Sequence, residues 1–166
     1  MSTFGLQLPS FTFAGVSDDA MFERIALTAV TAEESGFNSF FVMDHYHQIA
    51  NIGPPTEPML EAYTVLAGVA ARTSKIKLGA MVTGVTYRNP GFLAKVATTL
   101  DIVSAGRAIL GIGAAWNEEE SRAYGYDWPT VPPDGGHPAH AGRAHPGHRL
   151  VPVHRPSHRT RHRRRS

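Results

Sequence analysis

Short apolar segments alternate with segments of helical periodicity along residues 3–113, and this alternation limits the folds open to the chain. Four runs have the composition of strands, and the stretches between them repeat apolar residues at helical spacing. Each strand-helix unit is roughly 35 residues long, as is typical of parallel strands joined by right-handed helical crossovers. The expected strands are residues 3–9, 38–43, 75–82 and 107–113.

The helices expected between these strands carry recognisable start and stop signals. Ser17, followed by two acidic residues, begins the first helix, and Gly36 ends it. The second helix begins near Leu60 and ends near Thr73-Ser74. Asn89, followed by a proline, caps the third helix, which is expected to end before Gly106.

Two architectures satisfy this order: half of an eight-stranded TIM-type (β/α)8 barrel, and an open doubly wound sheet. A doubly wound sheet that binds a nucleotide needs a glycine-rich turn after its first strand, whereas residues 9–19 contain one glycine. A barrel places its active site at the carboxyl ends of its strands. Polar or glycine-bearing segments follow the second, third and fourth strands. The sequence therefore predicts an α/β fold, the N-terminal half of a TIM-type barrel with about four β/α units.

The composition changes abruptly after Trp128. Residues 129–166 contain eight arginines, seven histidines and one acidic residue, for a net charge of +7, whereas residues 1–128 carry −5. Because apolar residues are too few to offset the entropy of ordering, we expect a folded domain over 1–128 and a disordered tail over 129–166. A frameshifted carboxyl terminus is the favoured explanation. A basic arm for nucleic acid and a histidine-rich metal chelator remain open.

Several classes of protein do not fit the composition. The chain has no cysteine, which excludes a disulfide framework and a zinc-thiolate site. No segment approaches the ~20 apolar residues that a membrane-spanning helix needs. The first residues lack the basic segment and long apolar core of a secretion signal. We therefore expect a cytoplasmic enzyme without membrane contacts.

Asp44 and His45 directly follow the apolar second strand, which would place them at the mouth of a barrel. An imidazole there could hydrogen-bond a cofactor carbonyl or transfer a proton near neutral pH, so we select both residues as candidate catalytic groups. Alternatively, Asp44 caps the loop and His45 packs against the domain. His45 and His47 could also belong to a metal site, but the patterned region offers no third ligand, and no metal is expected.

The ends of the third and fourth strands supply candidate cofactor-binding residues. Gly84 lies among β-branched residues, which indicates a bulge, a close approach of the backbone to a ligand or a simple strand exit. Gly111 and Gly113 begin a dinucleotide fingerprint, which fails because Trp116 occupies the third glycine position. Small residues here would leave room for a flat ring beside Trp116, and Glu118–Glu120 are expected to form a solvated helix start. The selected residues are Thr83, Gly84, Val85, Gly113, Ala114, Trp116 and Asn117.

Together these features resemble the luciferase-like monooxygenase family, in particular its actinobacterial deazaflavin-dependent branch. The resemblance covers about residues 3–128 and rests on FGLQLPSF, AEESGFNSFFVMDHYHQ, EAYTVLAGVAARTSKIKLGAMVTGVTYRNP and LDIVSAGRAILGIGAAWNEEESRAYGYDW. It implies an eight-stranded barrel that binds coenzyme F420, or alternatively FMN, and performs hydride transfer or monooxygenation on a small organic substrate. It also implies that His45 is the family's strand-two histidine and that a non-prolyl cis peptide, here Gly84-Val85, cradles the ring.

The chain departs from the family pattern in two ways. Some deazaflavin-dependent dehydrogenases have an acid just after the strand-four glycines, where this chain has Ala114 and Ala115, so a proton-donor role is not carried over. Family members also continue for roughly as many residues again, and barrels hold cofactor phosphates near strands seven and eight. We therefore expect a truncated, impaired copy whose open sheet edges could form a homo-oligomer. A non-catalytic, self-associating half-barrel and a nucleic-acid-binding protein acting through its tail are the alternatives.

Overall fold

Strands and helices alternate along the chain in the computed structural model, which describes residues 2–126, residue 128 and the backbone of residues 149–152. A short 3-10 turn, η1 (Val85–Tyr87), precedes the third helix. The helices are α1 (Asp18–Glu34), α2 (Ala62–Arg72), α3 (Pro90–Val103) and α4 (Glu118–Ala123). The strands are β1 (Gly5–Leu8), β2 (Ser39–Val42), β3 (Lys77–Ala80), β4 (Thr83–Gly84), β5 (Ala108–Gly113) and β6 (Arg149–Pro152).

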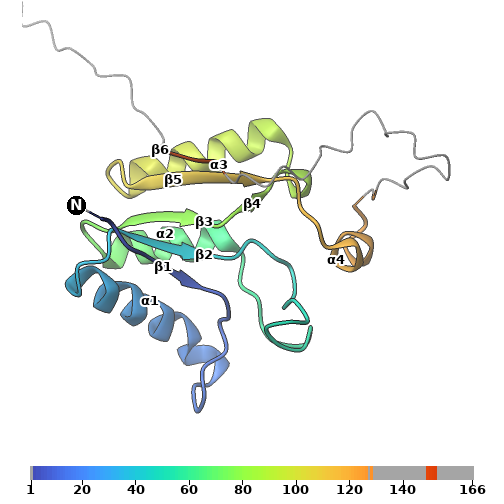
Figure 1. The fold of residues 1–166 in the computed structure, drawn as a ribbon, viewed down its shortest axis with the longest axis horizontal. Coiled ribbons are helices and arrows are strands. Elements are labelled where there is room, and N and C mark those ends of the chain that lie inside the picture. The colour runs from blue at the N-terminus through green and yellow to red at the C-terminus, as the bar shows by residue number, and fades with distance from the viewer. Residues whose placement is uncertain (1, 127, 129–148, 153–166) are drawn as a thin grey trace, which may run out of the picture.

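The first five strands form a parallel arrangement in the order β1-β2-β3-β5-β4. The register pairs Phe40 with Leu78, and Leu78 with Ala108. Figure 1 shows α1, α2 and α3 beside the strands that they connect, in the manner of part of a barrel wall. The predicted alternation of parallel strands and helical crossovers is confirmed, and the described residues form a partial barrel.

The core lies between this sheet and the helices. Phe40 and Leu78 on the strands and Ile25, Leu66 and Val69 on the helices are completely buried. Each of these side chains stabilises the fold by about 1.5–3 kcal/mol on burial. The helical spacing of the apolar residues in α1 and α2 therefore reflects packing against the sheet.

Strand β6 lies in the segment that was expected to be disordered. Its residues pair antiparallel to β5, with Leu110 opposite Val151. The unpaired backbone groups of a sheet edge can accept a further strand whatever its side chains are, and the disorder of the tail as a whole stays a prediction. The rest of the predicted tail, residues 129–148 and 153–166, lies outside the described residues, and the division of the chain at residue 128 stays a prediction.

Two polar side chains join elements at the end of the sheet where β3 begins. The Glu33 carboxylate accepts hydrogen bonds from the backbone N–H groups of Ser74, Lys75 and Ile76, at 2.6–3.1 Å. The Arg107 guanidinium donates to the carbonyl oxygens of Ala70 and Ile76, at 2.7 and 2.9 Å. These contacts fix the loop between α2 and β3.

Among the residues with described positions, no helix is long and apolar enough to cross a membrane.

Candidate active site

The candidate residues that follow β2, β3 and β5 lie at one edge of the sheet. The Asp44 carboxylate accepts a hydrogen bond from the backbone N–H of Gly84, at 2.9 Å. The ring of His45 meets the ring of Trp116 edge-on, with centroids 6.0 Å apart. Three segments that are distant in the sequence are thus brought together, as expected for the carboxyl ends of parallel strands.

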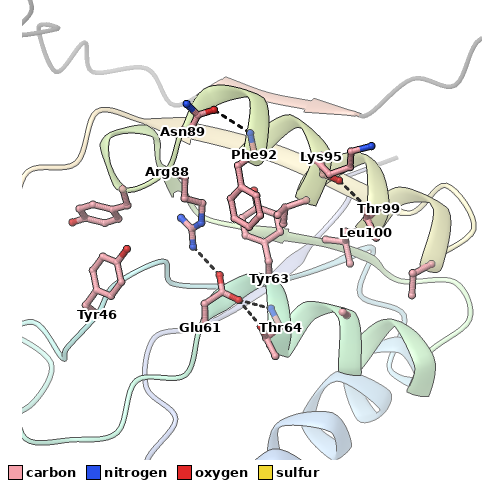
Figure 2. A pocket seen from close by; sticks show the side chains of 14 residues that line it. Tyr46, Glu61, Tyr63, Thr64, Arg88, Asn89, Phe92, Lys95, Thr99 and Leu100 are labelled. Carbon is pink, nitrogen blue, oxygen red and sulfur yellow. Dashed lines mark hydrogen bonds and ion pairs between the residues drawn. The ribbon is translucent and has the colours of Figure 1, made fainter. Parts of the chain in front are cut away.

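Asp44 anchors two other segments. The Arg88 guanidinium donates to both Asp44 carboxylate oxygens, at 2.6 and 2.7 Å, and to Glu61 at 2.8 Å. Burial favours the neutral form of Arg88, but the hydrogen bonds and charges of the two carboxylates prevail and raise its pKa. Figure 2 shows Arg88 reaching from the start of α3 toward Glu61 at the start of α2. Because both Asp44 oxygens accept hydrogen bonds, we interpret this residue as a structural anchor of the site.

His45 contacts the carboxylate of Glu120, which is not among the candidate residues expected from the sequence. Its Nδ1 lies 2.8 Å from Oε2 of Glu120, whose side chain is completely buried. The same carboxylate accepts hydrogen bonds from the Tyr46 backbone N–H and, at 2.8 Å, from the Tyr87 hydroxyl. Burial raises the pKa of Glu120, but these hydrogen bonds outweigh burial, so that its pKa is lowered and the carboxylate is ionised at neutral pH.

The expected solvated helix start over Glu118–Glu120 is therefore wrong at its last residue. Glu118 and Glu119 are exposed, whereas Glu120 lies on the side of α4 that faces the loop after β2. The physical reason is that one turn of helix presents consecutive residues in different directions, so a run of three acids cannot all face solvent when one side is packed.

A cluster of tyrosines surrounds this carboxylate. Tyr46 stacks on Tyr124 with centroids 4.5 Å apart, and its hydroxyl is hydrogen-bonded to that of Tyr126. The Tyr126 hydroxyl also donates to the carbonyl of Tyr87, at 3.1 Å. Burial and the neighbouring oxygens raise the pKa of Tyr46 and of Tyr87, so both remain neutral phenols. In the sequence these tyrosines lie in DHYH after β2, in VTYR after β4 and in AYGY at the end of α4, and their recurrence is the signal that the sequence offers.

The segment after β3 differs from expectation in one respect. The non-prolyl cis peptide lies between Met81 and Val82, not between Gly84 and Val85. This bond lies between β3, which ends at Ala80, two residues before the expected strand end, and β4, where the chain pairs again. Gly84 contributes close packing instead, since a Cβ atom there would come within 2.6 Å of the Tyr87 ring.

The other residues selected after β3 belong to the wall of the site. Thr83 is completely buried, and its hydroxyl is hydrogen-bonded to that of Tyr63 at 2.7 Å. Val85 lies in η1 and packs against the core. The Thr83 side chain is therefore part of the packed interior, and Val85 is partly buried beside it.

The segment after β5 combines small residues with an exposed ring. A Cβ atom at Gly113 would come within 2.6 Å of a methyl group of Val82, so the glycine permits a close approach of the two segments. Ala114 is exposed, and Trp116 is 62% exposed. The Asn117 side chain caps α4 by accepting a hydrogen bond from the backbone N–H of Glu120, at 3.3 Å. Its amide therefore has a structural role.

These features leave an exposed aromatic ring and one imidazole nitrogen at this end of the sheet. The Val82 side chain packs directly against Gly113, and Trp116 supplies an exposed aromatic face next to His45. Within the described part of the chain, Nε2 of His45 makes no hydrogen bond, and no group of three or more His, Asp or Glu residues is placed to hold a metal ion. The edge can therefore offer one imidazole nitrogen to a ligand.

A groove of about 800 Å³ lies elsewhere, between α2 and α3. Glu61, Arg88 and Tyr46 border one end of it, as Figure 2 shows, and apolar and polar residues of α2 and α3, Phe92 and Lys95 among them, line the rest. Because it lies on the helix side of the sheet and contains neither His45 nor Gly113, we do not assign the cofactor to it.

The model of the family described as luciferase-like monooxygenase matches residues 2–133. The chain is 33% identical over 135 residues to a phthiodiolone/phenolphthiodiolone dimycocerosates ketoreductase of Mycobacterium sp. (strain JLS), which covers 69% of this chain and 35% of the relative. It is 36% identical over 106 residues to an F420-dependent glucose-6-phosphate dehydrogenase of Microbacterium testaceum, covering 62% and 30%. The chain spans about a third of the length of these curated relatives.

Two solved structures superpose on this partial barrel. The coenzyme F420-dependent tetrahydromethanopterin reductase of Methanopyrus kandleri superposes with a TM-score of 0.60 at 29% identity, covering 78% of this chain and 31% of that one. The oxygenating constituent of 3,6-diketocamphane monooxygenase of Pseudomonas putida, in complex with FMN, superposes with a TM-score of 0.62 at 25% identity, covering 74% and 32%.

Proposed function

Because the chain belongs to the luciferase-like monooxygenase family, we propose that it acts as an oxidoreductase with a deazaflavin or flavin bound at the carboxyl ends of its strands. The observation that supports this most is the meeting of His45, Gly113 and Trp116 at one edge of the sheet. We propose coenzyme F420 as the cofactor and FMN as the alternative, since relatives named for F420 share up to 38% identity with this chain.

Each residue at this edge has a distinct task in the proposal. When bound, the deazaflavin would supply hydride transfer to or from a small organic substrate. Val82, which packs against Gly113, would form the wall beside a flat ring, and the exposed ring of Trp116 would cover one side of it. Nε2 of His45 accepts or returns the proton that accompanies hydride transfer, because it is the ring nitrogen left unengaged by Glu120.

Equilibrium binding tests the proposal. Coenzyme F420 and FMN are titrated separately into the full chain, into Trp116→Ala and into His47→Asn. Trp116 is largely exposed, so its truncation should leave the fold intact while removing a stacking contact, and F420 affinity should fall about tenfold. His47 lies on the same loop, and its Nδ1 is hydrogen-bonded to the neighbouring Gln48 carbonyl, so His47→Asn serves as the matched control.

Three outcomes would count against the proposal. Failure of the full chain to bind either cofactor would refute it. Equal F420 affinities of the Trp116→Ala variant and the full chain would show that Trp116 does not contact the cofactor. Tighter binding of FMN than of F420 would show that FMN, and not the deazaflavin, is the cofactor.

A further inference from the structure

The Glu120 carboxylate has no access to solvent, although its neighbours Glu118 and Glu119 are exposed. A buried charge is tolerated only when several donors satisfy it. Glu120 reaches across 75 residues of sequence to contact the loop that carries His45. The groups around this carboxylate determine which nitrogen of the His45 ring carries the hydrogen.

The two carboxylate oxygens have different partners. Oε1 accepts from the Tyr46 backbone N–H, a group that can only donate. Oε2 lies 2.8 Å from the Tyr87 hydroxyl and 2.8 Å from Nδ1 of His45. An ionised carboxylate can only accept, so Nδ1 must carry a hydrogen. The lowered pKa of Glu120 agrees with an ionised group at this position.

We propose that Glu120 is a positioning residue, which holds His45 in the tautomer with the hydrogen on Nδ1 and keeps Nε2 as the nitrogen that meets a ligand. The tautomer of a histidine is set by the hydrogen bond that its other nitrogen makes. Its catalytic meaning, that proton exchange with a bound ligand occurs at Nε2, rests on the function proposed above. The tautomer itself is a property of the chain without cofactor.

Replacement of Glu120 by glutamine should change the hydrogen-bonding group that faces Nδ1 of His45. The Tyr46 backbone N–H still requires an acceptor, so the amide oxygen must face it. The amide nitrogen then faces Nδ1 of His45 and donates to it, which makes Nδ1 an acceptor and moves the ring hydrogen to Nε2. Glu120→Gln should therefore invert the tautomer of His45, although the side chain retains nearly the same size.

The experiment is nitrogen-15 NMR of the histidine rings in the full chain, without cofactor, at about pH 8, where an ordinary imidazole is neutral. Comparison with His45→Asn identifies the His45 signals among those of the nine histidines. We expect Nδ1 of His45 to be protonated in the wild type and Nε2 to be protonated in Glu120→Gln. Tyr87→Phe removes a hydroxyl from the same oxygen of Glu120 and should leave the wild-type tautomer in place.

Two results would overturn the proposal. A wild-type protein with the hydrogen on Nε2 would refute it outright, and this measurement does not depend on the folding of any variant. A folded Glu120→Gln variant with an unchanged tautomer would show that Glu120 has a packing role alone. Loss of cofactor binding with the predicted tautomers would refute the proposed function and leave the positioning role intact.

Discussion

The Asp44 carboxylate and the Arg88 guanidinium form a two-hydrogen-bond ion pair that joins the loop after β2 to the start of α3. Arg88 also holds Glu61 at the start of α2 and lies over the ring of Tyr63, with the guanidinium carbon 5.4 Å from the ring centroid. One cation thus fixes the positions of three segments around the site. Because both oxygens of Asp44 accept hydrogen bonds from Arg88, the two opposite charges can be buried beside the proposed cofactor site.

Arg88→Gln should destabilise the domain by about 3–5 kcal/mol, because it leaves the buried Asp44 without its partner charge. Chemical denaturation followed by circular dichroism measures the change in unfolding free energy. Arg72→Gln is the matched control, since Arg72 forms an exposed ion pair with Glu23 and its loss should have no measurable effect. Equal stability of the two variants would contradict the anchoring role of Arg88.

The Glu33 carboxylate should make stability depend on acid pH. Burial opposes the ionised form, but hydrogen bonds from the Ile76, Lys75 and Ser74 segment prevail and lower its pKa from 4.5 to about 2. Because the pKa in the folded state is depressed, its contribution is fully present above pH 4.5 and is lost as the pH falls toward 2. After allowance for solvent screening this contribution is about 1 kcal/mol.

Thermal unfolding between pH 5 and pH 2.5 measures this dependence, and Glu33→Gln should flatten it. Glu34→Gln, on the neighbouring exposed carboxylate, is the control and should retain the dependence of the wild type. An unchanged pH profile in Glu33→Gln would show that another group causes the acid sensitivity.

Arg107→Lys should lower the unfolding free energy by about 2 kcal/mol although it conserves the charge. The Arg107 guanidinium donates to the backbone carbonyls of Ser104, Ala70 and Ile76, and a lysine ammonium cannot reach acceptors spread in this way. Urea denaturation measures the change. Arg24→Lys, on the exposed face of α1, should behave as the wild type, and an equal effect of the two substitutions would argue against the bridging role.

The parts of the fold that depend on local patterns could be predicted from the sequence. The buried strand SFFV and the cap at Asn89, which accepts hydrogen bonds from the first turn of α3, follow from neighbouring residues alone. The meeting of His45 and Trp116 at one edge follows from the parallel order of the strands.

The remaining features depend on contacts between distant segments. Glu120 is buried because α4 packs on the loop after β2, and its sequence neighbours give no sign of this. Strand β6 forms because an edge of β5 is available, although the composition around it predicts disorder. The cis peptide lies between Met81 and Val82, just after the end of β3, and the residue types in this segment do not indicate its position.

The most direct test of the cofactor site is a titration of the nitrogen-15-labelled full chain with coenzyme F420, followed by amide and indole chemical shifts. We predict progressive changes at His45, Gly113 and the Trp116 indole, with none along the groove side of α3 near Phe92 and Lys95. Changes confined to the α2–α3 groove, with constant signals at the strand ends, would contradict the account.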